Sequence, residues 1–296
     1  MKNHWHIVAV VGIIFILSEV ALRLFWGLGN APLYMEDCEY EYIVVPNQDG
    51  YRFGKHYHYN SFSMRCDEPD STRTIVLGLG DSVIFGGVQT DNDSLATTLF
   101  TKETGIQMLN ISAGSWGPDN CAAYLKKHGL FGAKAMWLIV SSHDARDNID
   151  YEKVVGESPS YPDKQYLLAL GELFGRYVLP RIFKKEDIDD PDAKVLKGIK
   201  KKGLVFNPGF DLLLQMADSA GIPLYVCLHP EKSEINQSRY NEQGEEIIQW
   251  CESNSVKLIK EIDEGITQAE MRDDVHLNEK GQRFEANLMK KYIRLE

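Results

Sequence analysis

The stretch VLGLGDSVIFGG, residues 76–87, decides the fold, because an apolar run ends there on Gly80, Asp81 and Ser82. Gly, Asp and Ser form turns, and Asp and Ser cap helices, so a plain turn is one interpretation. The other is that a buried strand delivers a reactive hydroxyl to its carboxyl end. Partners for Ser82 elsewhere in the chain must decide between the two.

Five short apolar runs alternate with amphipathic segments along the chain. The runs are residues 74–79, 105–112, 135–142, 222–229 and 256–262. We expect helices at about 93–104, 119–131 and 241–254, and a last helix within 277–295. This alternation predicts an α/β fold with a parallel sheet covered on both faces. Sites in such sheets lie beyond the carboxyl ends of the strands, where Ser82, Ser112, Ser142 and His229 fall.

Composition and charge narrow the function classes. The 296 residues suit one large domain or two modest ones, and 44% of them are hydrophobic and 25% charged, which is ordinary for a globular protein. The net charge of -11 argues against a nucleic-acid partner, because phosphates require a basic surface.

The N-terminus carries the unbroken apolar run IVAVVGIIFIL, residues 7–17. Extended from Trp5 to Trp26 it reaches the roughly 20 residues that cross a bilayer, with tryptophans at both ends. Glu19 and Arg23 interrupt it, but their i,i+4 spacing allows them to pair. A cleaved signal peptide and an uncleaved anchor both remain open, and the lack of a small-x-small cleavage site favours the anchor. Few positive charges follow the run, which predicts that the bulk of the chain lies outside the cytoplasm.

The pattern predicts three parts: residues 1–28 as the anchor or signal segment, 29–72 as an arm with short strands around 40–45 and 51–59, and 73–296 as the main domain. Residues 150–210 read as an insertion, with a helix candidate at 166–179 and a mixed-charge stretch that carries EDIDDPD, residues 186–192. Two roles of this insertion are equally open: it forms a lid over the site, or it is a helical segment packed far from the site.

The five cysteines form no CxxC or Cys/His spacing, so no zinc site is expected. In an oxidising compartment Cys38 and Cys66 are a candidate disulfide, which the odd cysteine count leaves open.

Partners for Ser82 occur near the C-terminus in MRDDVHLNEKG, residues 271–281. Asp273 and His276 are three residues apart, just before a helix that Asn278 can cap. This spacing places an acid beside an imidazole, and a hydrolytic serine needs such a base and such an orienting group. Asp274 is an alternative candidate for the acid that orients His276.

Four blocks in order resemble the SGNH or GDSL hydrolases: GDS (80–82), NISAGSWGPDN (110–120), SSHDARDN (141–148) and DDVH (273–276). The resemblance covers residues 74–296 and implies a flavodoxin-like three-layer α/β/α sandwich. It also implies that Ser82 is the nucleophile, that Asp273 and His276 complete the triad, and that the Ser82 and Gly114 N–H groups form the oxyanion hole.

The third block departs from the family, which has Gly-x-Asn-Asp where this chain has Ser141, Ser142, His143 and Asp144. His143 takes the place of the asparagine that donates to the oxyanion, and a ring N–H can donate one such bond. The alternative is a structural His143, with Asn148 or Ser142 as the donor. Asp144 and His229 are candidate substrate contacts, although Asp144 can instead hold its loop by hydrogen bonds and His229 can simply bond a loop.

The resemblance implies a serine esterase that removes a small acyl group, most simply acetyl, from a carbohydrate or another ester, without a metal or an organic cofactor. Two other interpretations stay open. An acyl-enzyme shielded from water would make the protein an O-acyltransferase acting on a cell-surface polysaccharide. Loss of activity would make it a non-catalytic polysaccharide-binding or assembly protein.

Overall fold

A computed structural model describes residues 2–182 and 199–295. Its centre is a five-stranded parallel sheet with the strand order β6-β5-β7-β8-β9. The strands are β5 (Ile75–Gly80), β6 (Gln107–Ser112), β7 (Met136–Ser141), β8 (Leu224–His229) and β9 (Lys257–Lys260). All four pairings are parallel, in the flavodoxin-like order. The predicted α/β fold is therefore confirmed.

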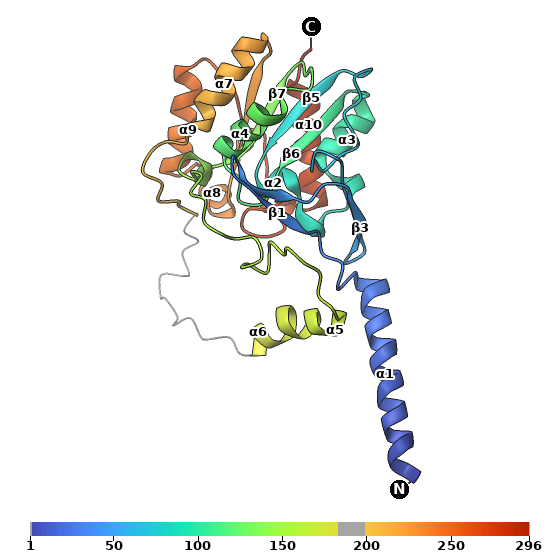
Figure 1. Ribbon diagram of the computed structural model, residues 1–296. Coiled ribbons are helices and arrows are strands. Elements are labelled where there is room, and N and C mark those ends of the chain that lie inside the picture. Colours follow the sequence, from blue (N-terminus) through green and yellow to red (C-terminus); the bar gives the residue numbers. More distant parts are fainter. Residues whose placement is uncertain (1, 183–198, 296) are drawn as a thin grey trace.

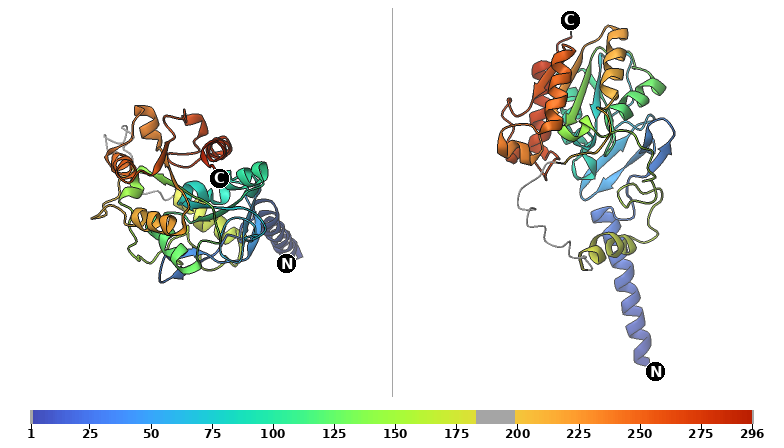
Figure 2. Two further views of the ribbon diagram at one scale, coloured as in Figure 1. Left: turned by 90° about the horizontal axis from the view of Figure 1, so that it is seen from above. Right: turned by 90° about the vertical axis from the view of Figure 1, so that its left-hand side faces the viewer.

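Helices cover both faces of this sheet (Figures 1 and 2). One face packs against α3 (Ala96–Thr104) and α10 (Glu279–Tyr292), the other against α4 (Pro118–His128), α7 (Gly209–Ala220) and α9 (Glu242–Ser253). The inner strands β5, β7 and β8 are mostly apolar because both of their faces are buried. Within β5, for example, Val76 points into one core while Leu77 and Leu79 point into the other.

The predicted helices agree with the observed ones to within a few residues. Asn278 caps α10, as the sequence suggested, by accepting from the N–H groups of Lys280 (2.8 Å) and Gly281 (3.1 Å). The periodicity did not single out α7 or the short α8 (Lys232–Gln237).

The arm forms two antiparallel hairpins. The first joins β1 (Tyr34–Asp37) to β2 (Glu41–Val44), and the second joins β3 (Gln48–Arg52) to β4 (Lys55–Tyr59). Both pack on the main domain: the Trp116 indole donates to the Tyr42 carbonyl oxygen at 2.9 Å, and the rings of Tyr59 and Phe85 stack. Cys38 and Cys66 are both free thiols, so the candidate disulfide is not formed.

Helix α1 (Lys2–Trp26) projects away from the rest of the molecule (Figure 1). Its stretch Trp5–Trp26 contains an 18-residue window with a mean hydropathy of 2.4, and no residue of that window is buried, so the helix is long and apolar enough to span a membrane or to be a signal sequence. The predicted Glu19–Arg23 pair is present, with 2.8 Å between Arg23 Nε and Glu19 Oε1.

Residues 169–182 are helical; the segment begins beside the domain-side half of α1 and extends away to one side (Figure 1). They comprise α5 (Ala169–Glu172), the π-helical η4 (Leu173–Val178) and α6 (Leu179–Ile182). The helix predicted at 166–179 is confirmed, shifted by about one turn. The acidic stretch 186–192 and the lysines beside it at 184, 185 and 197 lie outside the described residues.

Candidate active site

The end of β5 places Ser82 where the sheet opens. Gly80 has φ +155°, and a Cβ there would lie 2.6 Å from the carbonyl oxygen of Ile139 on β7, so only glycine lets the two strands approach. Asp81 caps α2 (Ser82–Phe85) by accepting from the Val83 N–H at 2.8 Å. Ser82 is the first residue of that helix. The capping interpretation of Gly-Asp-Ser is thus correct for Asp81 and leaves the hydroxyl of Ser82 free for other partners.

Those partners are the two C-terminal residues that the sequence singled out. Ser82 Oγ lies 3.0 Å from His276 Nε2. His276 Nδ1 lies 2.8 Å and 2.9 Å from the two carboxylate oxygens of Asp273. A hydroxyl, an imidazole and a carboxylate in this sequence of contacts can activate the hydroxyl as a nucleophile.

The carboxylate of Asp273 is held in its charged form. Partial burial acts to raise its pKa, but the N–H groups of His276 (2.8 Å) and Val275 (3.1 Å), together with the His276 ring, lower it to about 2. Asp273 is therefore ionised at any working pH and can stabilise a positive charge on His276. The competing Asp274 instead gives its carbonyl oxygen to the Lys232 N–H.

His229 supports the loop that carries this pair. The ring is fully buried, with Nε2 at 2.7 Å from the Val275 carbonyl oxygen and Nδ1 at 2.7 Å from Glu261. Burial acts to lower the pKa of His229, but Glu261 and the Val275 carbonyl raise it. The sequence left two roles open for His229, a bond to a loop and a contact with substrate, and the structure contains the bond to a loop. A direct contact with substrate stays a prediction.

The loop after β6 presents a backbone donor. The carbonyl oxygen of Gly114 accepts from the hydroxyls of Tyr42 (2.8 Å) and Tyr161 (3.1 Å), which fixes the orientation of that residue. Within residues 2–182 and 199–295 its N–H has no hydrogen-bond partner. Gly114 and Ser82 line the same cavity.

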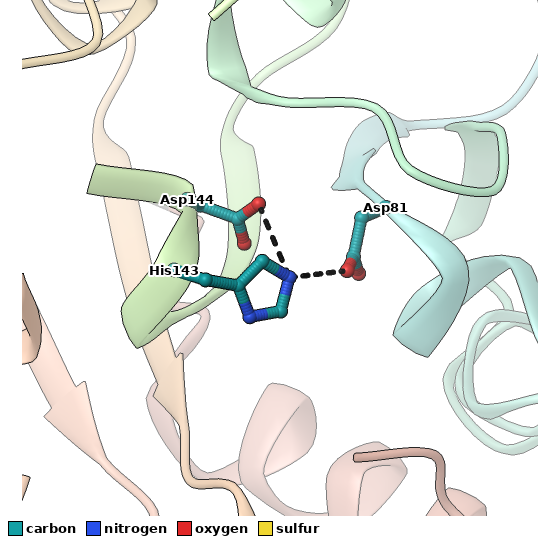
Figure 3. Close-up of side chains that lie close together, drawn as sticks. All are labelled: Asp81, His143 and Asp144. Atoms are coloured by element: carbon teal, nitrogen blue, oxygen red, sulfur yellow. Dashed lines mark ion pairs between the residues drawn. The ribbon is translucent and has the colours of Figure 1, made fainter. Parts of the chain in front are cut away.

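His143 lies in a cluster of buried carboxylates, of which Figure 3 shows Asp81 and Asp144. Its Nδ1 is 3.1 Å from Glu231, and its Nε2 faces Asp81 and Asp144 at 4.0 and 3.9 Å. Burial acts to lower the pKa of the ring, but the carboxylates of Asp144, Glu231 and Asp81 raise it to about 9. The ring is therefore an imidazolium at neutral pH, and its role as a third oxyanion donor stays a prediction.

Asp144 is 1% exposed, and one of its oxygens accepts from the Ser141 N–H at 2.7 Å. The bond to Ser141 holds the turn η3 (Ser142–Ala145), as the loop-holding alternative expected. A contact between Asp144 and substrate stays a prediction.

Two buried clusters in the described residues have the composition of metal sites. In the first, ligand atoms of Asp81, His143 and Asp144 lie within 4.8 Å of one another, and His143 Nδ1 is already bound to Glu231 at 3.1 Å. The second comprises Cys227, Glu261 and Glu285, where burial raises the pKa of the thiol and of the Glu285 carboxyl. The protein itself supplies partners in this cluster, because Cys227 Sγ lies 3.6 Å from Glu261 and 3.7 Å from Glu285.

A cavity of about 320 Å³ opens over the Ser82–His276 pair. Its wall comes from the main domain, from the arm at Ala31, Pro32 and Tyr34, and from the insertion at Ser160, Tyr161, Pro162 and Arg176. The insertion thus lies over this site. A larger cavity, about 870 Å³, lies between α4, α7 and residues 201–205 and includes none of the triad residues.

Sequence reasoning missed the residues that support the site. Glu231, Glu261, Tyr42 and Tyr161 act through contacts with residues distant in the sequence, and neither spacing nor periodicity marks such a residue.

No protein-family model matches the chain, and no curated protein sequence matches it either. Solved structures with a similar arrangement include a proposed lipolytic protein of the G-D-S-L family from Desulfitobacterium hafniense, with 11% identity, a TM-score of 0.45, and 75% of this chain and 100% of that chain covered. A member of the lipolytic G-D-S-L family from Veillonella parvula has 13% identity and a TM-score of 0.43, with 74% and 98% covered. A psychrotrophic esterase from Pseudoalteromonas has 11% identity and a TM-score of 0.40, with 74% and 95% covered. At these values the likeness says nothing about chemistry, so any function must be inferred from the side chains themselves.

Proposed function

We propose that the protein is a serine ester hydrolase that works through Ser82, His276 and Asp273. The observation that carries the proposal is the pair of contacts on His276: Nε2 at 3.0 Å from Ser82 Oγ, and Nδ1 at 2.8 Å from Asp273. One imidazole then contacts both the group that must lose a proton and the group that stabilises the resulting charge.

In the first half-reaction Ser82 Oγ attacks the acyl carbon while His276 Nε2 takes its proton. The tetrahedral oxyanion is held by the N–H groups of Ser82 and Gly114, with the His143 ring as the proposed third donor. Collapse breaks the bond between the acyl carbon and the alcohol oxygen, which receives the proton from His276. In the second half-reaction a water molecule attacks the acyl carbon while His276 takes its proton. Collapse of this second tetrahedral intermediate releases the acid, and Ser82 Oγ receives the proton from His276.

We propose a small acyl group, most simply acetyl, carried on a carbohydrate hydroxyl. The cavity of about 320 Å³ supports a small group, because it is near the lower end of the usual range of about 300–1,000 Å³. We also propose that α1 is an uncleaved anchor, with the main domain outside the cytoplasm. The predominantly apolar 22-residue stretch supports the anchor, and the lack of Lys and Arg at residues 24–51 supports the orientation.

The test is hydrolysis of an aryl acetate by the full-length protein in detergent. We expect Ser82→Ala to lose several orders of magnitude in kcat with an unchanged melting temperature. Ser219→Ala, on the exposed side of α7, is the matched control and should retain full activity. More than about 1% residual activity in Ser82→Ala would reject Ser82 as the nucleophile.

Product analysis separates hydrolysis from transfer. With a polysaccharide present as acceptor, we expect free acetate. An acetylated saccharide in its place would identify an O-acyltransferase that uses the same serine.

A further inference from the structure

Two charged side chains of α1 bind the insertion. Glu19 accepts from the N–H groups of Ala169 (2.7 Å) and Leu170 (3.0 Å), and Arg23 donates to the Leu167 carbonyl oxygen at 2.8 Å. The first N–H groups of a helix have no partner within the helix, so the Glu19 carboxylate caps α5 from outside. The charges that interrupt the apolar run thus attach residues 167–170 to α1.

This attachment fixes the depth of the insertion relative to a bilayer. At 1.5 Å per residue, Trp5 to Trp26 spans about 33 Å, close to the roughly 30 Å of a hydrocarbon core. Glu19 lies about 10 Å before Trp26 along the same axis. Residues 169–182, which extend to one side of α1 in Figure 1, then lie at the boundary between headgroups and acyl chains, where interfacial helices bury their apolar face about 5–10 Å deep.

The side chains at this level suit that position. Leu167 is 90% exposed and Phe174 is 50% exposed, and Phe25 and Trp26 at the end of α1 are exposed as well. Leu168, Leu179 and Ile182 of the insertion are exposed as well. Exposed apolar side chains beside a membrane-spanning helix are typical of an interfacial segment.

The insertion is also bound to the arm. The Glu172 carboxylate is fully buried, where it pairs with Arg52 and accepts from the Gly29 N–H at 2.6 Å. Arg52 also donates to the Tyr177 hydroxyl at 3.0 Å. Arg176, which is four residues after Glu172, lines the cavity that contains Ser82. The cavity wall and the apolar surface thus belong to one segment.

We propose that residues 166–182 lie in the membrane interface and that the Ser82 cavity takes its ester from an amphiphile held in that same bilayer. This inference rests on the proposed hydrolysis at Ser82 and names its substrate class: a short acyl ester in the headgroup region of a membrane lipid or a lipid-linked saccharide. A soluble ester reaches the same serine only by diffusion from bulk water.

The test uses two aryl acetates that differ in one ring substituent: a methoxy group, which leaves the ester soluble, or a hexadecyloxy chain, which holds it in a vesicle. The full-length protein is reconstituted in phosphatidylcholine vesicles. We expect Leu167→Glu/Phe174→Glu to lower kcat/KM on the vesicle-bound ester about tenfold or more, with less than a twofold change on the soluble one. Leu204→Glu, at a 95% exposed position far from α1, should change neither. Equal losses on both esters, or no loss on the vesicle-bound ester, would overturn the proposal.

A second measurement does not depend on catalysis. In a Cys38→Ser background, an environment-sensitive maleimide is attached to Phe174→Cys or to Leu204→Cys, since the other native thiols are buried or partly buried. We expect brominated phosphatidylcholine to quench the probe at 174 and to leave the probe at 204 unquenched. Equal signals at both positions would overturn the interfacial position. If the wild type hydrolyses neither ester while the probe at 174 is quenched, the hydrolysis proposal fails and the membrane position stands.

Discussion

Because the His143 ring carries a positive charge, we predict that its contribution to the stability of the folded protein depends on pH. Its ring faces Asp81 at the end of β5, Asp144 within η3 and Glu231 just before α8. Replacing it by glutamine, in His143→Gln, keeps a polar group of similar size but removes the positive charge from among three buried carboxylates.

The pKa shift sets the size of the effect. The carboxylates outweigh burial and raise the pKa of His143 from 6.5 to about 9, and one pKa unit corresponds to about 1.4 kcal/mol. The folded state therefore gains about 3 kcal/mol from this proton. Because the folded pKa is raised, the gain is complete below pH 6.5 and is lost as the pH rises through about 9. Burial also raises the pKa of Asp144, which lowers stability in the same direction as the pH rises.

Thermal unfolding of the full-length protein in detergent micelles, from pH 6.5 to pH 10, measures this effect. We expect His143→Gln to melt on the order of 5–10 °C below the wild type at pH 6.5, and the gap to close by pH 10 because both proteins then lack the charge. The difference between the two proteins cancels titrating groups that do not interact with His143, such as His229. A gap of constant size across the whole range would refute the reasoning, because it would show that the ring acts through packing alone.

Three further predictions concern activity and location. If the His143 ring donates to the oxyanion, His143→Asn should keep much of the activity and His143→Ala should lose about 2.7–4 kcal/mol in kcat per folded molecule; equal losses would assign the ring another role. Asp273→Asn should lower kcat by about 10⁴ with little change in KM, measured on the aryl acetate, and a loss below tenfold would contradict its orienting role. The full-length protein should stay in the membrane pellet after a carbonate wash, whereas a shortened mature chain released from cells would identify residues 1–28 as a cleaved signal.

The fold could be predicted because its signal is local. Most strands lie in runs of buried apolar residues, such as 135–142, and the covering helices α3, α4, α9 and α10 have a recognisable periodicity of their own. The triad could be placed because Ser82 follows such a strand, and Asp273 and His276 are three residues apart. The separation between Ser82 and His276 was bridged only by the resemblance and the rule that sites gather at strand ends.

The remainder could not be predicted because it depends on contacts between distant segments. Nothing near Glu172 indicates that its carboxylate is buried against Arg52, since in the sequence it is one acid within an apolar helix. The sequence indicated that Glu19 pairs with Arg23, but not that Glu19 also caps α5, about 150 residues later. The cluster around His143 was missed because Glu231, which binds its Nδ1, lies in a loop without periodicity.

The central claim is that His276 activates Ser82, and covalent labelling tests it most directly. The full-length protein is treated with a fluorophosphonate, and the modified peptide is identified by mass spectrometry. We predict one adduct, on Ser82, that forms at least a hundredfold more slowly in His276→Ala and at an unchanged rate in the matched control His128→Ala, whose ring lies at the far end of α4. An unlabelled wild-type Ser82, or labelling at the same rate in His276→Ala, would contradict the account.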